Sequence, residues 1–192
     1  MSRSNRERTE QTRQTLLDSA KALFVEKGYA DTATPDIVAA AGVTRGALYH
    51  HFEDKKALFR AVIEREAMAV AEAIEARTPS RLTPREALLD GGSAYFDAMA
   101  QEGRTKLLLL EAPAVLGLSD ASAIDQENAE TTLQRGLEAY LPGAGPTLLP
   151  ITRLLSAAFD RAAIAIDAGE SRSDYEHAIA ALLDSLADHL RR

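Results

Sequence analysis

The chain has 192 residues, of which 46% are hydrophobic and none is cysteine. A chain of this length can bury a sizeable core in one or two domains. Without cysteine, a disulfide framework and a thiolate metal site are both excluded. No apolar run approaches the roughly 20 residues that span a bilayer, and the N-terminus is too polar for a signal peptide. We therefore expect a cytoplasmic protein with no membrane partner, no cofactor and no metal.

The net charge of −7 is unevenly distributed along the chain. Residues 1–60 carry ten Lys and Arg against eight Asp and Glu, a net charge of +2. Residues 61–192 carry twelve against twenty-one, a net charge of −9. This asymmetry is typical of a DNA-binding head joined to an acidic body that phosphate does not attract.

The first predicted helix runs from about Arg8 to Lys27. Its apolar residues recur at the spacing of one buried helical face, and Gly28 follows as a residue that ends helices. The residues of this face are Leu16, Leu17, Ala20, Leu23 and Phe24.

Two short helices joined by a tight turn are predicted next. The Thr34-Pro35 pair has the hydroxyl N-cap and the early proline of a helix start, so a helix is expected over residues 34–41. Gly42 supplies the left-handed turn that ends this helix. Thr44 is a second N-cap and begins a helix over residues 45–51. Helices connected in this way form a helix-turn-helix, whose second helix lies in the major groove of DNA.

The second of these helices has two different sides. Leu48 and Phe52 lie one turn apart and are expected to anchor it to the preceding helix. Arginine, tyrosine and histidine on another side can contact phosphates and base edges, while a glycine allows close approach to a second surface. The alternative is an ordinary solvated helix face. The residues of this side are Arg45, Gly46, Tyr49 and His50.

From about Arg13 to Ile63 the chain resembles the TetR/AcrR family of transcriptional regulators. The resemblance implies an all-α fold, with an N-terminal three-helix DNA-binding domain over residues 1–54 and a helical regulatory domain over residues 55–192. It is carried by two runs: Gly28-Tyr29-x-x-Thr32-x-Thr34-x-x-Ile37 and Ala41-Gly42-Val43-Thr44-x-Gly46-x-Leu48-Tyr49-x-His51-Phe52-x-x-Lys55.

The same resemblance implies which residues contact DNA. Phosphate contacts are expected from Thr34, Tyr49, His51 and Lys55, and base contacts from Thr44, Arg45, Gly46 and His50. Two positions depart from the family pattern: Ala33, where many members have Ser or Thr, and Val38, where Ala is common. The first departure removes one expected phosphate contact.

The remainder of the chain is also predicted to be helical, which gives about nine helices in all. No segment shows the alternation of apolar and polar residues that is typical of a strand. The later helices are expected over residues 55–76, 83–100, 106–118 (interrupted by Pro113), 120–140, 147–168 and 173–190.

The last two predicted helices are the expected dimer surface. The helix over residues 147–168 is apolar on nearly every side, apart from a narrow polar strip of Arg153, Asp160 and Asp167. The resemblance implies that both helices pair with their copies in a second subunit as a four-helix bundle. A homodimer also suits a palindromic operator. The alternative is that the two helices only close the core of one subunit.

The resemblance also implies a small-molecule pocket in the regulatory domain. The candidate residues are apolar for the most part, so a hydrophobic or aromatic effector is expected, although each residue also suits a plain core. The pair Gly91-Gly92 indicates a kink or a close approach within its helix. The candidates are Tyr95, Phe96, Met99, Leu109, Glu111 and Phe159.

Two other functions stay open at this point. A small helical enzyme would need a catalytic pair such as His177 with Asp184, yet the chain has no Gly-rich phosphate loop and no nucleophile constellation. A ligand-binding or partner-binding helical dimer without DNA affinity is the third alternative. The sequence favours a ligand-responsive regulator that binds double-stranded DNA, and the family resemblance favours a repressor.

Overall fold

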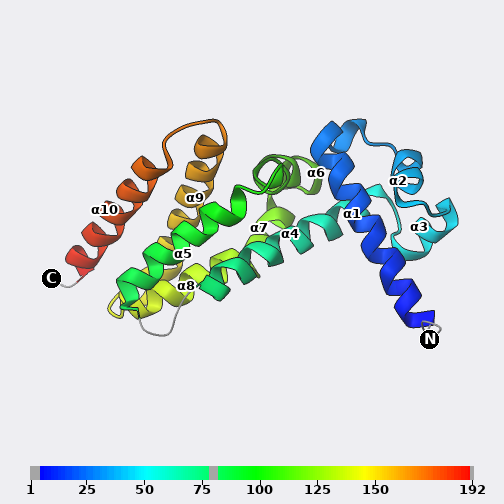
Figure 1. Ribbon diagram of the computed structural model, residues 1–192. Helices are drawn as coiled ribbons and strands as arrows, with labels where there is room; N and C mark the ends of the chain where they lie inside the picture. The colour runs from blue at the N-terminus through cyan, green and yellow to red at the C-terminus, as the bar shows by residue number, and fades with distance from the viewer. Residues whose placement is uncertain (1–4, 78–81, 191–192) are drawn as a thin grey trace. The chain divides into compact units, whose positions relative to one another are not determined.

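The computed structural model describes residues 5–77 and 82–190 of the chain. Within these residues the fold is all-α, as predicted, with ten α-helices and no strand (Figure 1). The elements are α1 (Asn5–Asp31), α2 (Thr34–Ala41), α3 (Arg45–His51), α4 (Lys55–Arg77), α5 (Pro84–Met99), the π-helix η1 (Lys106–Glu111), α6 (Ala112–Leu116), α7 (Leu118–Gln126), α8 (Ala129–Tyr140), the 3-10 helix η2 (Gly145–Thr147), α9 (Leu148–Asp167) and α10 (Arg172–Leu190).

The described residues form two compact units. The head unit comprises residues 5–66 and 106–121, and the regulatory unit comprises residues 67–77, 82–105 and 122–190. The predicted domain boundary after residue 54 follows the end of the DNA-binding motif, whereas this division follows packing. Helices α4 and α7 each contribute to both units.

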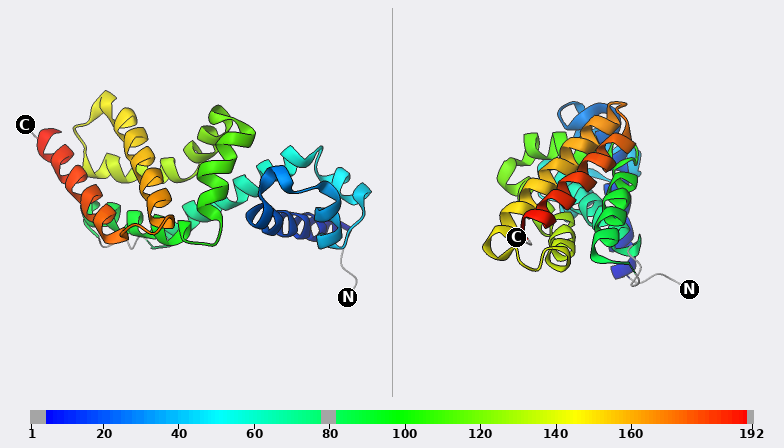
Figure 2. Two further views of the ribbon diagram at one scale, coloured as in Figure 1. Left: turned by 90° about the horizontal axis from the view of Figure 1, so that it is seen from above. Right: turned by 90° about the vertical axis from the view of Figure 1, so that its left-hand side faces the viewer.

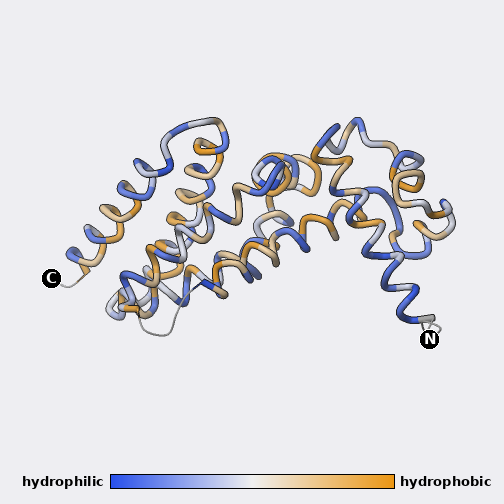
Figure 3. Tube along the Cα trace, viewed as in Figure 1, coloured by the Kyte–Doolittle hydropathy of each residue, from blue (hydrophilic) through white to orange (hydrophobic). Residues whose placement is uncertain are grey.

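The head unit is built on the C-terminal half of α1. The N-terminal half of this helix is hydrophilic, and its apolar residues begin at Leu16 (Figure 3). Phe24 is fully buried and contacts the ring of Phe59 edge-on, with 5.1 Å between centroids. Gly28 breaks the helix as predicted, with φ +82° and ψ 165°, and a last turn extends to Asp31. The apolar face predicted for this helix therefore forms the core of the head.

The N-cap of α2 lies one residue earlier than predicted. The N-cap is Ala33, whose carbonyl oxygen accepts from the backbone N–H groups of Asp36 and Ile37 at 3.0 and 3.3 Å. Thr34 is therefore the first helical residue, and the prediction that it caps the helix is wrong. The helix begins without a side-chain cap, and Pro35 in its first turn has no N–H to satisfy.

The chain returns to the head unit at residues 106–121. The carboxylate of Glu111 accepts from the backbone N–H of Tyr29 at 3.0 Å, and the ammonium of Lys106 lies 3.6 Å from the same carboxylate. Pro113 does not interrupt this segment, contrary to the prediction, because it occupies the first turn of α6, where a missing N–H is tolerated. The turn comes at Gly117, with φ +97°.

The regulatory unit contains α5, α8, α9 and α10. Helix α5 begins at a complete capping box, in which Thr83 and Glu86 satisfy each other's backbone N–H groups. The single helix predicted over residues 120–140 is wrong, since α7 and α8 are separate helices. Asn128 divides them: its side-chain amide donates to the carbonyl of Ile124 at 2.6 Å, which replaces the backbone hydrogen bond of a continuing helix.

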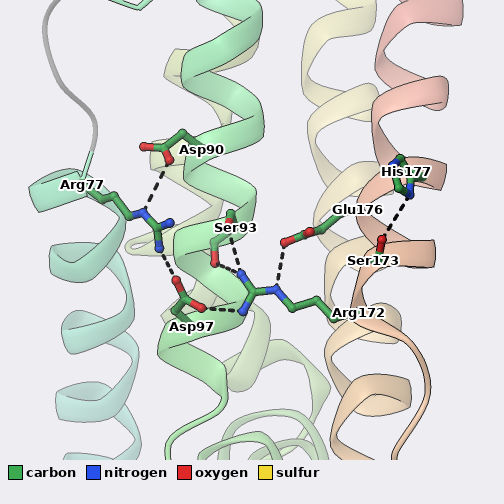
Figure 4. Close-up of polar contacts among 8 residues, drawn as sticks. All are labelled: Arg77, Asp90, Ser93, Asp97, Arg172, Ser173, Glu176 and His177. Atoms are coloured by element: carbon green, nitrogen blue, oxygen red, sulfur yellow. Dashed lines mark hydrogen bonds and ion pairs between the residues drawn. The ribbon is translucent and has the colours of Figure 1, made fainter.

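A polar network holds the start of α10 against α5 (Figure 4). The guanidinium of Arg172 donates to the carbonyl and the hydroxyl of Ser93 at 2.9 and 2.8 Å, and it pairs with Asp97. Arg77, at the end of α4, also pairs with Asp97. Helices α9 and α10 also lie side by side, as the views from other directions show (Figure 2). Helix α10 is thus fixed to the rest of its unit at its N-terminal end.

None of the described helices is long and apolar enough to cross a lipid bilayer.

Candidate DNA-binding face and effector cavity

The turn between α2 and α3 has the predicted geometry. Gly42 adopts φ +63° and ψ 30°, and its N–H donates to the carbonyl of Ala39 at 3.2 Å. Thr44 caps α3, because its hydroxyl accepts from the N–H of Ala47 at 3.1 Å. Gly42 therefore ends α2 and Thr44 begins α3, as the sequence predicted.

Helix α3 presents its polar side to solvent within the head unit. Leu48 is fully buried, and Phe52 is 6% exposed, as expected for residues that anchor the helix. Tyr49 is 43% exposed, and the guanidinium of Arg45 lies 5.4 Å from the centre of its ring. A Cβ atom added at Gly46 would approach only the hydroxyl of Thr44, at 3.9 Å. The predicted base-contacting residues Thr44, Arg45, Gly46 and His50 are all exposed.

Three of the predicted phosphate contacts lie at the border of this surface. Thr34, His51 and Lys55 are half-buried, whereas Tyr49 is exposed. Burial lowers the pKa of the His51 imidazole, and the neighbouring charges of His50 and Arg13 lower it further. The imidazole of His51 is therefore biased toward its neutral form.

Lys55 has a structural role that sequence reasoning missed. Its ammonium donates to the carbonyls of Tyr29 and Thr32 at 2.8 and 2.9 Å, and it lies 4.1 Å from the centre of the Tyr29 ring. Two of its three donors thus tie the start of α4 to the loop before α2. No local pattern in the sequence signals this contact, because Tyr29 and Lys55 are 26 positions apart and meet only when the helices fold back on each other. Its role as a phosphate contact stays a prediction.

A cavity of about 350 Å³ opens within the regulatory unit, between α4, α5, α7, α8 and α9. Of the predicted effector contacts, Tyr95 and Phe159 line it. Phe96 and Met99 are buried but are not among its lining residues, and Leu109 and Glu111 lie on η1 in the head unit. The main apolar lining residues are Ile74, Ala87, Leu88, Leu133 and Phe159.

Three glycines shape the wall of this cavity: Gly91, Gly92 and Gly136. A Cβ atom at Gly92 would meet the ring of Phe159 at 2.8 Å, and one at Gly136 would meet Leu88 at 2.7 Å. The close approach expected at the Gly91-Gly92 pair therefore occurs, and the approaching group is an aromatic ring of α9. Helices α5, α8 and α9 pack closely at these points and leave the space beside them open.

Three carboxylates, Glu75, Asp125 and Asp160, and one guanidinium, Arg135, also line the cavity, and sequence reasoning named none of them as site residues. Arg135 lies 3.3 Å from Glu75, so Asp125 and Asp160 are the lining acids that have no ion pair among the described residues. Asp160 accepts from the hydroxyl of Tyr95 at 2.7 Å, and Asp125 accepts from the hydroxyl of Ser156 at 3.1 Å. Burial, and then the charge of Asp160, raises the pKa of Asp125 to about 6. Burial is also the main cause of the raised pKa of Asp160, which the hydrogen bond from Tyr95 opposes. The signal for Asp160 was its place as a charge in an otherwise apolar helix.

The surface of α9 and α10 carries large exposed apolar side chains. Leu154 is 73% exposed and Leu149 is 42% exposed on α9, while Leu182 is 50% exposed on α10. Other apolar residues of these helices, such as Phe159 and Leu183, are buried within the unit. The two helices therefore close the core of one subunit and still leave leucines in solvent.

The groups considered for an enzyme do not form a catalytic pair. Asp184 pairs with Arg85 through two hydrogen bonds of 2.6 and 2.7 Å, which lower the pKa of its carboxyl. Glu176 accepts from Arg172 at 2.8 Å. The imidazole of His177 is exposed and lies 3.4 Å from the hydroxyl of Ser173 (Figure 4). The neighbouring carboxylates are thus engaged by arginines.

Comparison with known proteins also identifies the head unit as a match to a family of regulatory proteins. Residues 16–62 match the family described as "Bacterial regulatory proteins, tetR family". The transcriptional regulator AcrR of Shigella flexneri is 45% identical over 64 residues, which cover 33% of this chain and 30% of that protein. The TetC protein of transposon Tn10 from Escherichia coli is 31% identical over 123 residues, 60% of this chain and 58% of that protein. The matches thus span a third to three fifths of these relatives.

Solved structures are similar along nearly the whole chain. A TetR-family transcriptional regulator from Pectobacterium atrosepticum is 32% identical, with a TM-score of 0.71, and the match covers 96% of this chain and 95% of that one. The chain therefore belongs to the TetR family, whose members are transcriptional regulators and not enzymes.

Proposed function

We propose that this protein is a sequence-specific DNA-binding transcriptional regulator that acts as a ligand-responsive repressor. The observation that carries the proposal is the exposed polar side of α3, where Arg45 and Tyr49 lie in solvent beside a glycine that leaves room for a close approach. A short helix held by an N-cap and a buried leucine can enter a major groove without losing its own packing.

The contacts with DNA divide into two kinds. Thr44, Arg45, Gly46 and His50 contact base edges, because they occupy the exposed first turns of the recognition helix. Thr34, Tyr49, His51 and Lys55 contact phosphates at its border and position the helix. The single free donor of the Lys55 ammonium limits it to one such contact.

The partner in assembly is a second copy of the chain. Leu154 and Leu182 are large apolar side chains exposed on α9 and α10, and a second copy of these helices would bury them. A two-fold dimer places two recognition helices on the two halves of an approximately palindromic operator.

The effector binds in the cavity of the regulatory unit, where Tyr95 and Phe159 contact it. A volume of about 350 Å³ lies within the range of small-molecule sites. The effector releases DNA through its preference for the conformation of the dimer that fits the operator poorly. The lining is predominantly apolar, so the effector has a hydrophobic body.

Binding to the DNA that flanks its own gene tests the proposal. We expect salt-sensitive, sequence-selective binding, measured by fluorescence anisotropy. Arg45→Ala should weaken binding to the preferred sequence by about 1–3 kcal/mol and relax its selectivity, because the Arg45 side chain is exposed beside the Tyr49 ring and is available to a base edge. Arg135→Ala, at an exposed arginine that lines the cavity of the regulatory unit, is the control and should bind DNA as the wild type does when no effector is present.

The same measurement separates the other candidate functions. A helical dimer without DNA activity would show no selectivity for any flanking sequence at low salt. Equal losses from Arg45→Ala and Arg135→Ala would also contradict the proposal, since they would indicate only nonspecific charge attraction.

A further inference from the structure

The cavity of the regulatory unit combines an apolar wall with three carboxylates and one guanidinium. Glu75 and Arg135 pair with each other, which leaves the carboxylates of Asp125 and Asp160. Asp125 belongs to α7 and Asp160 to α9, so two separate helices direct an acidic side chain into one space. Both side chains are half-buried, and the groups that hydrogen-bond to them, Tyr95 and Ser156, are buried. A further carboxylate, Glu130 on α8, is 8% exposed, and its charge contributes to the raised pKa of both acids.

Within residues 5–77 and 82–190, no Lys, Arg or His lies within ion-pair distance of Asp125 or Asp160. Their hydrogen-bond partners are the two neutral hydroxyls. Arg135 lines the cavity but pairs with Glu75 at 3.3 Å, and Arg153 pairs with Glu130 at 3.7 Å. A carboxylate can accept about four hydrogen bonds, so one hydroxyl each leaves most of its capacity unused.

This arrangement opposes the ionised form of both acids. A buried charge is costly unless it is paired, and two like charges in one cavity add repulsion. The raised pKa values of Asp125 and Asp160 follow from burial and from the neighbouring acids. A ligand with a positive charge would remove both penalties at once, whereas an anion would increase them.

We propose that the cavity binds an amphiphilic cation, an organic ammonium whose charge lies between Asp125 and Asp160 and whose apolar body contacts Leu88, Leu133 and Phe159. The rings of Tyr95 and Phe159 add a favourable aromatic environment for such a charge. The wall at Gly91 gives the apolar body space, since a Cβ atom there would meet only Ile74, at 3.6 Å.

The inference rests on the proposed function in one respect, because it assigns a preference for positively charged ligands to the same cavity that we propose as the effector site. It narrows the effector from any hydrophobic compound to a hydrophobic cation. The binding of the ligand and the release of DNA can be measured separately, so the two proposals can fail separately.

Isothermal titration calorimetry of the full-length protein with three probes of one chain length tests the charge preference. The probes are decyltrimethylammonium, decanol and decanoate, each below its micelle concentration. We expect the cation to bind at least about tenfold more tightly than the alcohol and the anion to bind most weakly. Equal or tighter binding of decanol or decanoate, or no binding of any probe, would overturn the inference.

Substitution of the two acids locates the preference. Asp125→Asn with Asp160→Asn keeps the side-chain shapes and should bring the affinities for the cation and the alcohol together. Each single substitution should remove part of the difference, which covers the case in which the double variant fails to fold. The control Glu138→Gln neutralises an exposed carboxylate of α8 outside the cavity and should leave the tenfold ratio intact. Loss of the ratio in the control alone would contradict the assignment.

Release of operator DNA by the same probes separates the two proposals. Release by the cation supports both. A cation that binds without releasing DNA supports the charge inference and contradicts the regulatory function. Release by decanol or decanoate alone supports the regulatory function and overturns the charge inference.

Discussion

The core of the head unit and the cavity of the regulatory unit differ in how their carboxylates are paired. In the head, the carboxylate of Glu66 is nearly buried and pairs with Lys21 at 2.8 Å, and Glu111 accepts from a backbone N–H with Lys106 nearby. In the regulatory unit, Asp125 and Asp160 have only hydroxyl partners and line an open cavity. These two acids of the head are therefore paired, whereas Asp125 and Asp160 keep unused hydrogen-bonding capacity beside the cavity.

This difference suits two different tasks. A head that contacts bases must hold α3 in one orientation, because displaced side chains lose their directional hydrogen bonds. A unit that responds to a ligand must gain free energy when the ligand arrives, and unpaired carboxylates beside a cavity supply that gain. In the proposed function, the paired acids belong to the unit that holds α3, and the unpaired acids belong to the unit that responds to a ligand.

The largest expected effect on the free energy of unfolding comes from removing a buried aromatic ring, and one ring from each unit can be compared. Phe59→Ala should lower the free energy of unfolding by about 3–5 kcal/mol, because the ring is fully buried against Phe24 and Tyr29. Phe159→Ala should cost less, since part of its ring already faces the cavity and lacks contact atoms there. Urea denaturation followed by circular dichroism measures both. Equal losses would contradict the description of the regulatory unit as the more open of the two.

An intermediate effect on the free energy of unfolding is expected when Asp125, in the cavity of the regulatory unit, is replaced. The pKa of Asp125 is raised from 3.8 to about 6 in the folded protein, so the folded state binds its proton more tightly than the unfolded chain does. Ionisation therefore opposes folding, with the full cost present above about pH 6. Asp125→Asn should raise the free energy of unfolding at neutral pH by about 1–3 kcal/mol.

That gain should disappear as the pH falls from about 6 to about 4, where wild-type Asp125 becomes protonated in both states. Thermal unfolding at a series of pH values measures it. The neighbouring acids Asp160 and Glu130, the Tyr95 phenol and the Arg153–Glu130 pair are common to both proteins, so the difference isolates Asp125. A gain that grows at low pH would contradict this account.

The smallest expected effect is the loss of a helix N-cap, which should lower the free energy of unfolding equally in the two units. Thr44 caps α3 and Thr83 caps α5, each by accepting from the N–H three residues later. Either threonine to alanine substitution should lower the free energy of unfolding by about 1 kcal/mol. Only Thr44→Ala should also weaken operator binding. Weakening of similar size from Thr83→Ala would show that caps act on DNA binding through stability alone.

The local elements of the fold could be predicted from sequence because their causes are local. Gly42 and Thr44 set the turn and the cap by bonds to residues at most a turn away, and both were recognised. The prediction of one helix over residues 120–140 was wrong because the side-chain amide of Asn128 bonds to a backbone carbonyl and ends α7. The sequence allowed both conformations at this residue. The candidate DNA-binding residues could be named for the same reason, since they all lie within one short segment.

The amino-acid sequence by itself determined the helical class, the helix-turn-helix and the exposed polar side of its second helix, because helical periodicity and capping act over a few residues. Only the tertiary structure decided that Asp125 and Asp160 share a cavity and that Glu111 bonds to Tyr29. These contacts join residues far apart in the chain. Their geometry depends on how whole helices pack, and no short-range pattern encodes that packing.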